Sequence, residues 1–339
     1  MSSGIPPDSK TGLSSSGIGE AIRPFRMNST TRPSQFTRRE FLVTTALASI
    51  APLGVSADPA SQEKPAGTAA AVDTHVHCFA GKEDPRFPYH DRAPYRPDAP
   101  ATPRHLLKCM DELGIAHAII VHPEPYQDDH RYLEYCLEVG RKRFKGTCLF
   151  FADRPGSLAK LPDLVKRFPI VAVRVHAYAP DRLPPFGKPE LRDLWRLAAE
   201  NGLAVQIHME PRYAPGFEPL IKEFAETPVI IDHLGRPVQG TPEEHERVVR
   251  WSDLKNTVLK LSAIPATASY PHRNPTQVIR RLIESFGPGR IISGGGFSTG
   301  ATTASYRAAL DELRKSVGHL QVRDQEKILG GNAVKLFHL

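Results

Sequence analysis

Val72-Asp73-Thr74-His75-Val76-His77 is the stretch around which the rest of the chain can be interpreted. Its alternating pattern and β-branched residues predict a strand, and side chains two apart on a strand share a face. His75 and His77 therefore point the same way, so they could supply two nitrogen ligands to an ion such as zinc. Taken alone, the pair fits two hydrogen-bonded core histidines equally well.

Further apolar runs follow this stretch, each short and rich in valine and isoleucine, as buried parallel strands are. With the first, the predicted strands are residues 71–78, 117–123, 145–151, 171–177, 203–209, 229–235, 257–263 and 290–296. Helical patterns alternate with them, and Thr102 and Thr241 carry helix-start signals. β–α repeats over residues 71–339 predict an α/β fold, a (β/α)8 TIM barrel in a single domain. A doubly wound sheet is the alternative, but no glycine-rich phosphate loop follows the first strand.

The chain ahead of the barrel has the composition of a targeting segment. Residues 1–36 are rich in Ser, Thr, Gly and Pro, which predicts a disordered extension. Arg38 and Arg39 precede a 15-residue apolar run, so residues 37–57 are predicted to be a twin-arginine signal peptide and residues 58–70 a linker. The run is shorter than the ~20 residues of a membrane span. We therefore expect an exported, periplasmic protein whose mature chain has no stable membrane span.

Charge and cysteine content limit the classes of partner. The net charge of +7 is spread through the sequence without a basic run in the barrel region, so no nucleic-acid partner is expected. The four cysteines are too few for a disulfide scaffold and lack C-x-x-C spacing. The expected partner is a small-molecule substrate.

Histidines gather at the predicted strand ends. Parallel strands of a barrel end at one mouth, where barrel active sites lie. Six of the 14 histidines fall late in predicted strands, namely His75, His77, His122, His176, His208 and His233. Packing alone does not favour so many histidines at one end, because aliphatic residues fill barrel interiors better. The pattern predicts a functional site at the mouth. Lys260 alternates with two leucines and is expected to point outward.

Several motifs together carry a family resemblance over residues 71–339. They are the first stretch with His75 and His77, Val121-His122-Pro123 with Tyr126, Gln206-Ile207-His208, Ile231-Asp232-His233-Leu234-Gly235-Arg236-Pro237, and the closing segment 328–337. With them the chain resembles the amidohydrolase superfamily, in its branch of small TIM-barrel hydrolases related to pyrone dicarboxylate lactonase and sugar lactonases.

The resemblance implies roles for the residues at the mouth. His75, His77 and His208 match the positions that bind a catalytic metal, and His233 matches a catalytic or metal-completing position. No lysine stands in the fourth strand to bridge two metals, so one divalent ion at most is implied, with zinc the expected metal. The predicted substrate-binding residues are His122, Tyr126, Arg174, His176 and Arg236. Arg236 could clamp a carboxylate in a bidentate manner.

The eighth strand departs from the family pattern. The family ends this strand with an aspartate that serves as metal ligand and base, whereas Gly296 occupies the matching position here. Glycine has no group that could take a proton. Glu210, Glu124 and Asp128 are the candidates to replace this acid as the catalytic base, with Glu210 the first. If Gly296 marks the vacated position, Gly296→Asp should bind metal more tightly and speed hydrolysis.

Three functions follow as alternatives. The first is a metal-dependent hydrolase acting on a lactone, ester or similar small anionic compound, with metal-activated water at the mouth. The second is a metal-dependent decarboxylase of the same superfamily. The third is a degenerate barrel that only binds a small acid, which Gly296 favours. The intact histidine set places the hydrolase first.

Overall fold

The structure is a computed structural model that describes residues 71–154, 156–265 and 274–339. The predicted extension, signal peptide and linker over residues 1–70 lie outside this part and stay predictions. Within the described ranges, we find no helix of the length and apolar character that a membrane crossing requires.

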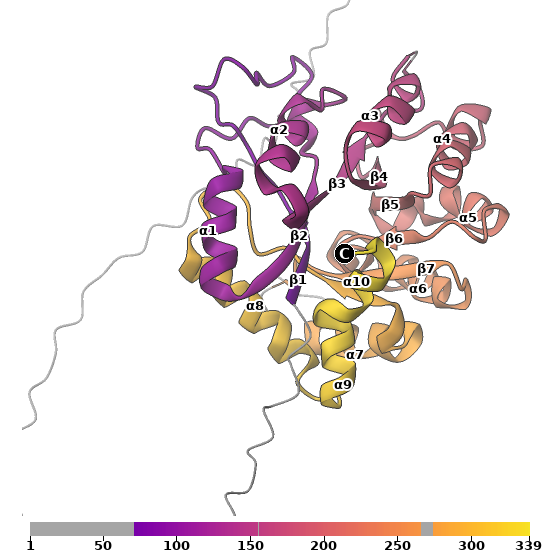
Figure 1. The fold of residues 1–339 in the computed structure, drawn as a ribbon. Helices are drawn as coiled ribbons and strands as arrows, with labels where there is room; N and C mark the ends of the chain where they lie inside the picture. The colour runs from indigo at the N-terminus through magenta and orange to yellow at the C-terminus, as the bar shows by residue number, and fades with distance from the viewer. Residues whose placement is uncertain (1–70, 155, 266–273) are drawn as a thin grey trace, which may run out of the picture. The chain divides into compact units, whose positions relative to one another are not determined.

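Eight parallel strands follow one another in chain order around a nearly closed barrel (Figure 1). The strands are β1 (Ala71–Val76), β2 (Ile115–Val121), β3 (Phe144–Leu149), β4 (Ile170–Ala177), β5 (Ala204–Met209), β6 (Val229–Ile231), β7 (Thr257–Leu261) and β8 (Ile291–Ser293). Each strand pairs with the next one along the chain, as the strand–helix alternation predicts. The expected TIM barrel is confirmed.

Helices alternate with the strands and surround them in Figure 1. They are α1 (Pro103–Leu113), α2 (Arg131–Gly140), α3 (Leu161–Arg167), α4 (Pro189–Glu200), α5 (Ala214–Glu223), α6 (Pro242–Arg250), α7 (Pro275–Phe286), α8 (Thr303–Val317), α9 (Val322–Glu326) and α10 (Asn332–Phe337). The start signals were correctly located. The Thr102 side chain accepts a hydrogen bond from the His105 N–H, and Thr241 forms a capping box with Glu244.

The lower end of the barrel is filled by an apolar layer. Side chains from six strands meet there with two residues of α10, which covers this end of the barrel. The layer contains Val72, Ile119, Ala172, Ala204, Ile230, Ile292, Ala333 and Phe337. Residues two apart on a regular strand share a face, so the polar residues two positions after Ala172, Ala204 and Ile230 lie inside the barrel above this layer. They are Arg174, Gln206 and Asp232. Strand β1 differs, because its pairing with β2 shifts in register between Asp73 and Val76.

Asp73 joins the two end strands of the barrel. Its carboxylate accepts hydrogen bonds from the backbone N–H groups of Gly295 (2.8 Å) and Gly296 (3.1 Å) and from the Tyr306 hydroxyl (2.8 Å). The Thr74 hydroxyl donates to the Ser293 carbonyl across the same seam. These bonds draw the chain after β8 onto β1, which explains why β8 ends at Ser293 and not at residue 296 as predicted.

Candidate functional site

A buried polar layer lies between the apolar floor and the mouth, with Asp232 at its centre. Asp232 Oδ2 accepts hydrogen bonds from Arg174 Nε (2.9 Å) and Gln206 Nε2 (3.0 Å). Its Oδ1 lies 3.2 Å from Lys260 Nζ and 3.5 Å from His75 Nδ1. Burial alone would raise the pKa of Asp232, but Lys260 and Arg174 hold this pKa well below its usual value. One ionised carboxylate thus faces two buried cations.

The outward direction expected for Lys260 is wrong. Its side chain is fully buried inside the barrel, and Nζ donates a hydrogen bond to the Thr74 carbonyl at 3.1 Å. Val258 and Ser262, two residues before and after it, also lie on the interior face. The leucines on either side of Lys260 pack outward against the helices. Both faces of this strand are buried, so the alternation of apolar and polar residues does not show which face is the interior of the barrel.

His75 and His77 meet at the mouth as predicted. Their Nε2 atoms lie 3.2 Å apart. His77 Nδ1 donates a hydrogen bond to the Val121 carbonyl at 2.8 Å, because a carbonyl can only accept. Burial lowers the pKa of His77 to about 3, so the ring is neutral at pH 7 and its Nε2 carries a lone pair. The lone pair of His77 Nε2 is therefore directed at His75 Nε2.

A left-handed turn presents His233 to the mouth. His233, Leu234, Gly235 and Arg236 all have positive φ, at 54°, 59°, 69° and 52°. Three of the four are not glycine, and such residues cost of order 1–3 kcal/mol each. This turn ends β6 at Ile231, four residues before the predicted boundary. Strain of this kind gathers at functional sites, where the surrounding structure enforces it.

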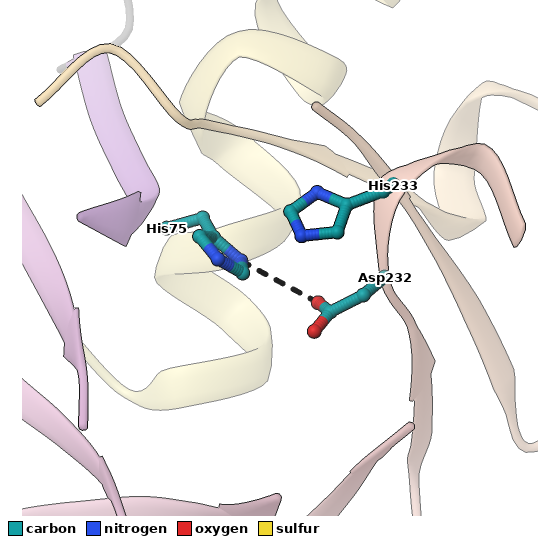
Figure 2. A group of neighbouring side chains, drawn as sticks. All are labelled: His75, Asp232 and His233. Carbon is teal, nitrogen blue, oxygen red and sulfur yellow. Dashed lines mark ion pairs between the residues drawn. The ribbon is translucent and has the colours of Figure 1, made fainter. Parts of the chain in front are cut away.

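The turn brings the His233 ring beside His75 and Asp232 (Figure 2). These three side chains each offer one ligand atom, and the three atoms lie within 4.8 Å of one another. The His233 and His75 ring centroids are 4.5 Å apart, and His233 Nδ1 lies 2.9 Å from the Ser262 hydroxyl. Burial lowers the pKa of His233 to about 3. The ring is thus neutral at pH 7 and held by Ser262.

His208 and His176 continue the ring of histidines along the mouth. The His208 ring centroid lies 5.2 Å from that of His233 and 5.3 Å from that of His176. His208 Nδ1 is buried and finds no hydrogen-bond partner in the described part of the chain. Of the predicted metal ligands, His75 and His77 are in direct contact, whereas His208 reaches His75 through the ring of His233. The ligand set stays a prediction.

Two predicted substrate-binding residues lie below the surface of the mouth. His122 is 1% exposed, and its Nε2 donates to the Gln127 carbonyl at 2.9 Å. Tyr126 is 2% exposed, and its hydroxyl accepts a hydrogen bond from the Ala80 N–H at 2.8 Å. Both side chains hold the loops that follow β1 and β2. Arg174 is likewise occupied, because its guanidinium is bound to Asp232.

Glu210 and Arg236 lie after β5 and β6. The Glu210 carboxylate is bound to the Arg212 guanidinium. Arg236 Nη1 is buried without a hydrogen-bond partner among the described residues, and its guanidinium lies over the Tyr178 ring at 5.6 Å. Arg236 therefore keeps donors available for a bound anion, whereas Glu210 is already paired.

Asp232, Lys260 and Ser262 complete the site, although no sequence motif assigned a role to them. Asp232 stands directly before His233 in the sequence, and its position two residues after Ile230 is the signal that places it inside the barrel. Glu124 forms a second buried acid. It binds the Tyr178 hydroxyl and lies 3.1 Å from Arg182 and 3.4 Å from His176 Nδ1.

In this backbone conformation a side chain at Gly296 would not reach the mouth. A Cβ atom at Gly296 would overlap the Tyr306 ring, so a side chain there would point into α8 and not into the mouth. A Cβ atom at Gly295 would instead lie 3.4 Å from Ser262 Cβ and 4.0 Å from the His75 carbonyl, beside the histidines. Gly295 has φ +111°, a conformation that an aspartate rarely adopts.

Gly296→Ala should therefore destabilise the protein by about 1–3 kcal/mol, because the methyl group has no room beside Tyr306. Chemical denaturation measures the change. Gly289→Ala is the matched control, since nothing lies within 4 Å of a Cβ atom there. A Gly296→Ala protein as stable as the parent would contradict this placement of the loop.

Comparison with known proteins places the chain in a family. The family model described as amidohydrolase matches residues 72–339. A 4-sulfomuconolactone hydrolase of Rhizobium radiobacter is 32% identical over 170 residues, covering 49% of this chain and 53% of that protein. The chain thus spans about half the length of this curated relative.

Solved structures share the fold. One is named as a probable 2-pyrone-4,6-dicarboxylic acid hydrolase of Acinetobacter baumannii with citric acid bound; its TM-score is 0.67 at 22% identity, covering 79% of this chain and 99% of that one. Another is an amidohydrolase of Burkholderia multivorans with bound zinc, with a TM-score of 0.62 at 15% identity, covering 80% of this chain and all of that one. The family match extends over the whole barrel, and the chain belongs to the amidohydrolase family.

Proposed function

We propose that this protein hydrolyses a lactone that carries an acid group, at the mouth of the barrel. The family match supports a hydrolase, and one relative is named for hydrolysis of a lactone. The observation that carries the proposal is the 3.2 Å contact between His75 Nε2 and His77 Nε2, with the His233 ring beside them. The residues directly after β8 are glycines and offer no carboxylate.

The two nitrogens fit a single divalent ion, with zinc the expected one. In the His75 tautomer that donates through Nδ1 to Asp232, the Nε2 atoms of His75 and His77 both carry lone pairs, which repel at 3.2 Å unless a cation joins them. In the tautomer whose Nδ1 accepts from Lys260 Nζ at 3.4 Å, His75 Nε2 instead donates to His77 Nε2. A bound ion would select the first tautomer. Zinc–nitrogen bonds of about 2.0–2.1 Å in a tetrahedron separate the nitrogens by about 3.3 Å. His208, whose ring lies 5.2 Å from that of His233, is the predicted third ligand.

A bound zinc ion would polarise the lactone carbonyl and lower the pKa of its water to ~7. The chain supplies the remaining functions. Asp232 orients His75 and balances the charges of Arg174 and Lys260. His233 is neutral at pH 7, and when its Nδ1 donates to the Ser262 hydroxyl, its Nε2 can accept a proton. Arg236 binds the acid group of the substrate.

We expect purified protein to contain about one zinc ion per chain, and His77→Ala to lose most of it, because fewer than three histidine ligands then remain in place. Elemental analysis of both proteins tests this. His319→Ala, an exposed histidine outside the mouth, is the control. A parent protein that stays free of metal after incubation with excess zinc would contradict the metal proposal.

The same preparation tests the reaction. Ring opening of 2-pyrone-4,6-dicarboxylate is followed by loss of the pyrone absorbance, and carbon dioxide release is measured in parallel on aromatic acids. Hydrolysis of the lactone supports the proposal. Release of carbon dioxide without ring opening would instead identify a decarboxylase, and tight binding without any product would identify a barrel that has lost catalysis.

A further inference from the structure

Lys260 is a buried cation below the mouth, and all three of its donors have partners. Its side chain has no exposed surface. Nζ donates to the Thr74 backbone carbonyl at 3.1 Å, forms an ion pair with Asp232 Oδ1 at 3.2 Å, and makes a hydrogen bond with His75 Nδ1 at 3.4 Å. An ammonium group has three N–H donors and no acceptor. Each partner must therefore offer a lone pair to Lys260, and this includes His75 Nδ1.

This contact determines which nitrogen of His75 carries the proton. Burial lowers the pKa of His75 well below its usual value, so the ring is neutral, with one N–H group and one lone pair. With the lone pair on Nδ1 facing Lys260, the proton is on Nε2. The other tautomer would turn an Nδ1–H group toward the ammonium. Its acceptor would be Asp232 Oδ1, which lies 3.5 Å away and makes no hydrogen bond within the described ranges.

The same tautomer completes a chain of hydrogen bonds across the mouth. His75 Nε2–H donates to His77 Nε2 at 3.2 Å, and His77 Nδ1–H donates to the Val121 carbonyl at 2.8 Å. Every donor from Lys260 to Val121 then faces an acceptor, and bonds that run in one direction strengthen one another in a low-dielectric interior. The chain uses both Nε2 atoms, so neither atom is available to a metal ion while the chain exists.

Binding of a metal ion requires the opposite tautomer of His75. Ligation uses the lone pair of Nε2, so the ring must lose its proton there and gain one at Nδ1. The new Nδ1–H group faces Asp232 Oδ1 (Figure 2) and also the Lys260 ammonium. The ring stays neutral, but the hydrogen bond from Lys260 is lost and two donors face each other. This rearrangement weakens the binding of the ion.

We propose that Lys260 is a positioning residue that opposes the metal: it holds the His75 proton on Nε2 and thereby weakens the binding of a divalent ion to His75 and His77. The inference rests on the metal site of the proposed function and extends it, because Lys260 contacts His75 at Nδ1, away from the ligating nitrogen. Asp232 acts in the opposite direction, since it accepts from the ligating tautomer. The result is a site that keeps its geometry without an ion and exchanges the ion readily.

Lys260→Met removes the ammonium group and keeps a side chain of similar length. This variant should bind Zn²⁺ about 10- to 100-fold more tightly than the parent, the scale on which groups that contact metal ligands change the affinity. Competition with a zinc-chelating dye measures the affinity of metal-free protein without reference to activity. Lys145→Met is the matched control and should bind Zn²⁺ as the parent does. Lys145 is a half-buried lysine of β3 that donates to the carbonyls of Phe337 and His338.

The tautomer is measured directly in the metal-free parent, so this part of the test does not depend on the folding of a variant. In a long-range 1H–15N correlation spectrum of histidine-labelled protein, His75 should show a protonated Nε2 and an unprotonated Nδ1. His75→Gln assigns the signals, and Lys260→Met should shift the proton toward Nδ1. A metal-free parent with this proton on Nδ1 would overturn the proposal. A gain in zinc affinity without a change of tautomer would also overturn it, since charge repulsion alone would then explain the gain.

The two measurements separate this inference from the proposed function. If the parent shows the expected tautomer and Lys260→Met binds Zn²⁺ more tightly, but no lactone is opened, the hydrolysis proposal fails and the role of Lys260 stands. If lactones are opened while Lys260→Met leaves zinc affinity and tautomer unchanged, the role of Lys260 fails alone. Absence of Zn²⁺ binding in both proteins would overturn the opposition to the ion together with the metal site.

Discussion

Asp232→Asn should lower the free energy of unfolding by about 3–5 kcal/mol. The side chain of Asp232 is fully buried and balances Arg174 and Lys260, which are themselves at most 5% exposed. Asparagine would leave both cations in the barrel interior without a negative charge and with little access to water. The loss is large compared with the 5–15 kcal/mol of a typical domain. Urea unfolding followed by circular dichroism measures it.

Two further variants separate unpaired charge from lost packing. Asp163→Asn removes an acid from an exposed ion pair with Arg167, 2.9 Å long, and should cost less than about 1 kcal/mol. The double variant Asp232→Asn with Lys260→Met removes one of the two buried cations that have lost their carboxylate. It should be more stable than Asp232→Asn alone. A double variant that is less stable than the single one would contradict the charge explanation.

Acid should destabilise the protein well above the pH at which carboxylates titrate. Burial lowers the pKa of His122 to about 4 and that of His77 and His233 to about 3, whereas an unfolded histidine has a pKa of about 6.5. Between these values the unfolded chain binds protons that the folded chain excludes. The stability from neutral burial is therefore complete above about pH 6.5 and is lost as the pH falls toward 4 and then 3.

Each such histidine contributes a slope of up to about 1.4 kcal/mol per pH unit in this window. Urea unfolding at about pH 7.5, 6 and 5, with a chelator present to remove any metal, measures the total slope. His122→Gln keeps a donor for the Gln127 backbone carbonyl but has no group that takes up a proton. The slope of its free energy of unfolding against pH should therefore be smaller than that of the parent by up to about 1.4 kcal/mol per pH unit. A free energy of unfolding that stays level over this range would show that the histidines do not titrate as expected.

The sequence predicted the barrel and its histidines because both depend on local patterns. Alternation places His75 and His77 on one face, and the same rule places Asp232 and Lys260 inside. The predicted outward direction of Lys260 was wrong because this strand carries its leucines on the outer face and its lysine on the inner face. A lysine among leucines would ordinarily be expected on the more exposed face. Burial of this cation depends on Asp232, which directly follows the neighbouring strand β6 and which no local pattern links to Lys260.

The direction of the chain after a strand was the second feature that could not be predicted from the sequence. The chain after β6 turns through four residues of positive φ, and the chain after β8 is drawn down by Asp73. Both events move a side chain away from the face that strand alternation assigns to it. His233 reached the mouth nonetheless, whereas Gly296 came to lie against Tyr306. Alignment on a motif locates such residues in the sequence, but the backbone conformation decides where they point.

The seam made by Asp73 also has a consequence for how the protein is synthesised. Asp73 and Gly295 are 222 positions apart, so the acid leaves the ribosome long before the amides that it binds. At about 5–20 residues per second this interval lasts roughly 10 to 45 seconds. During that time β1 lacks its neighbour β8, and the Asp73 carboxylate lacks the backbone amides of Gly295 and Gly296. The nascent barrel is an open sheet with an unprotected edge until translation is almost complete, and a chaperone that covers β1 would act on this state.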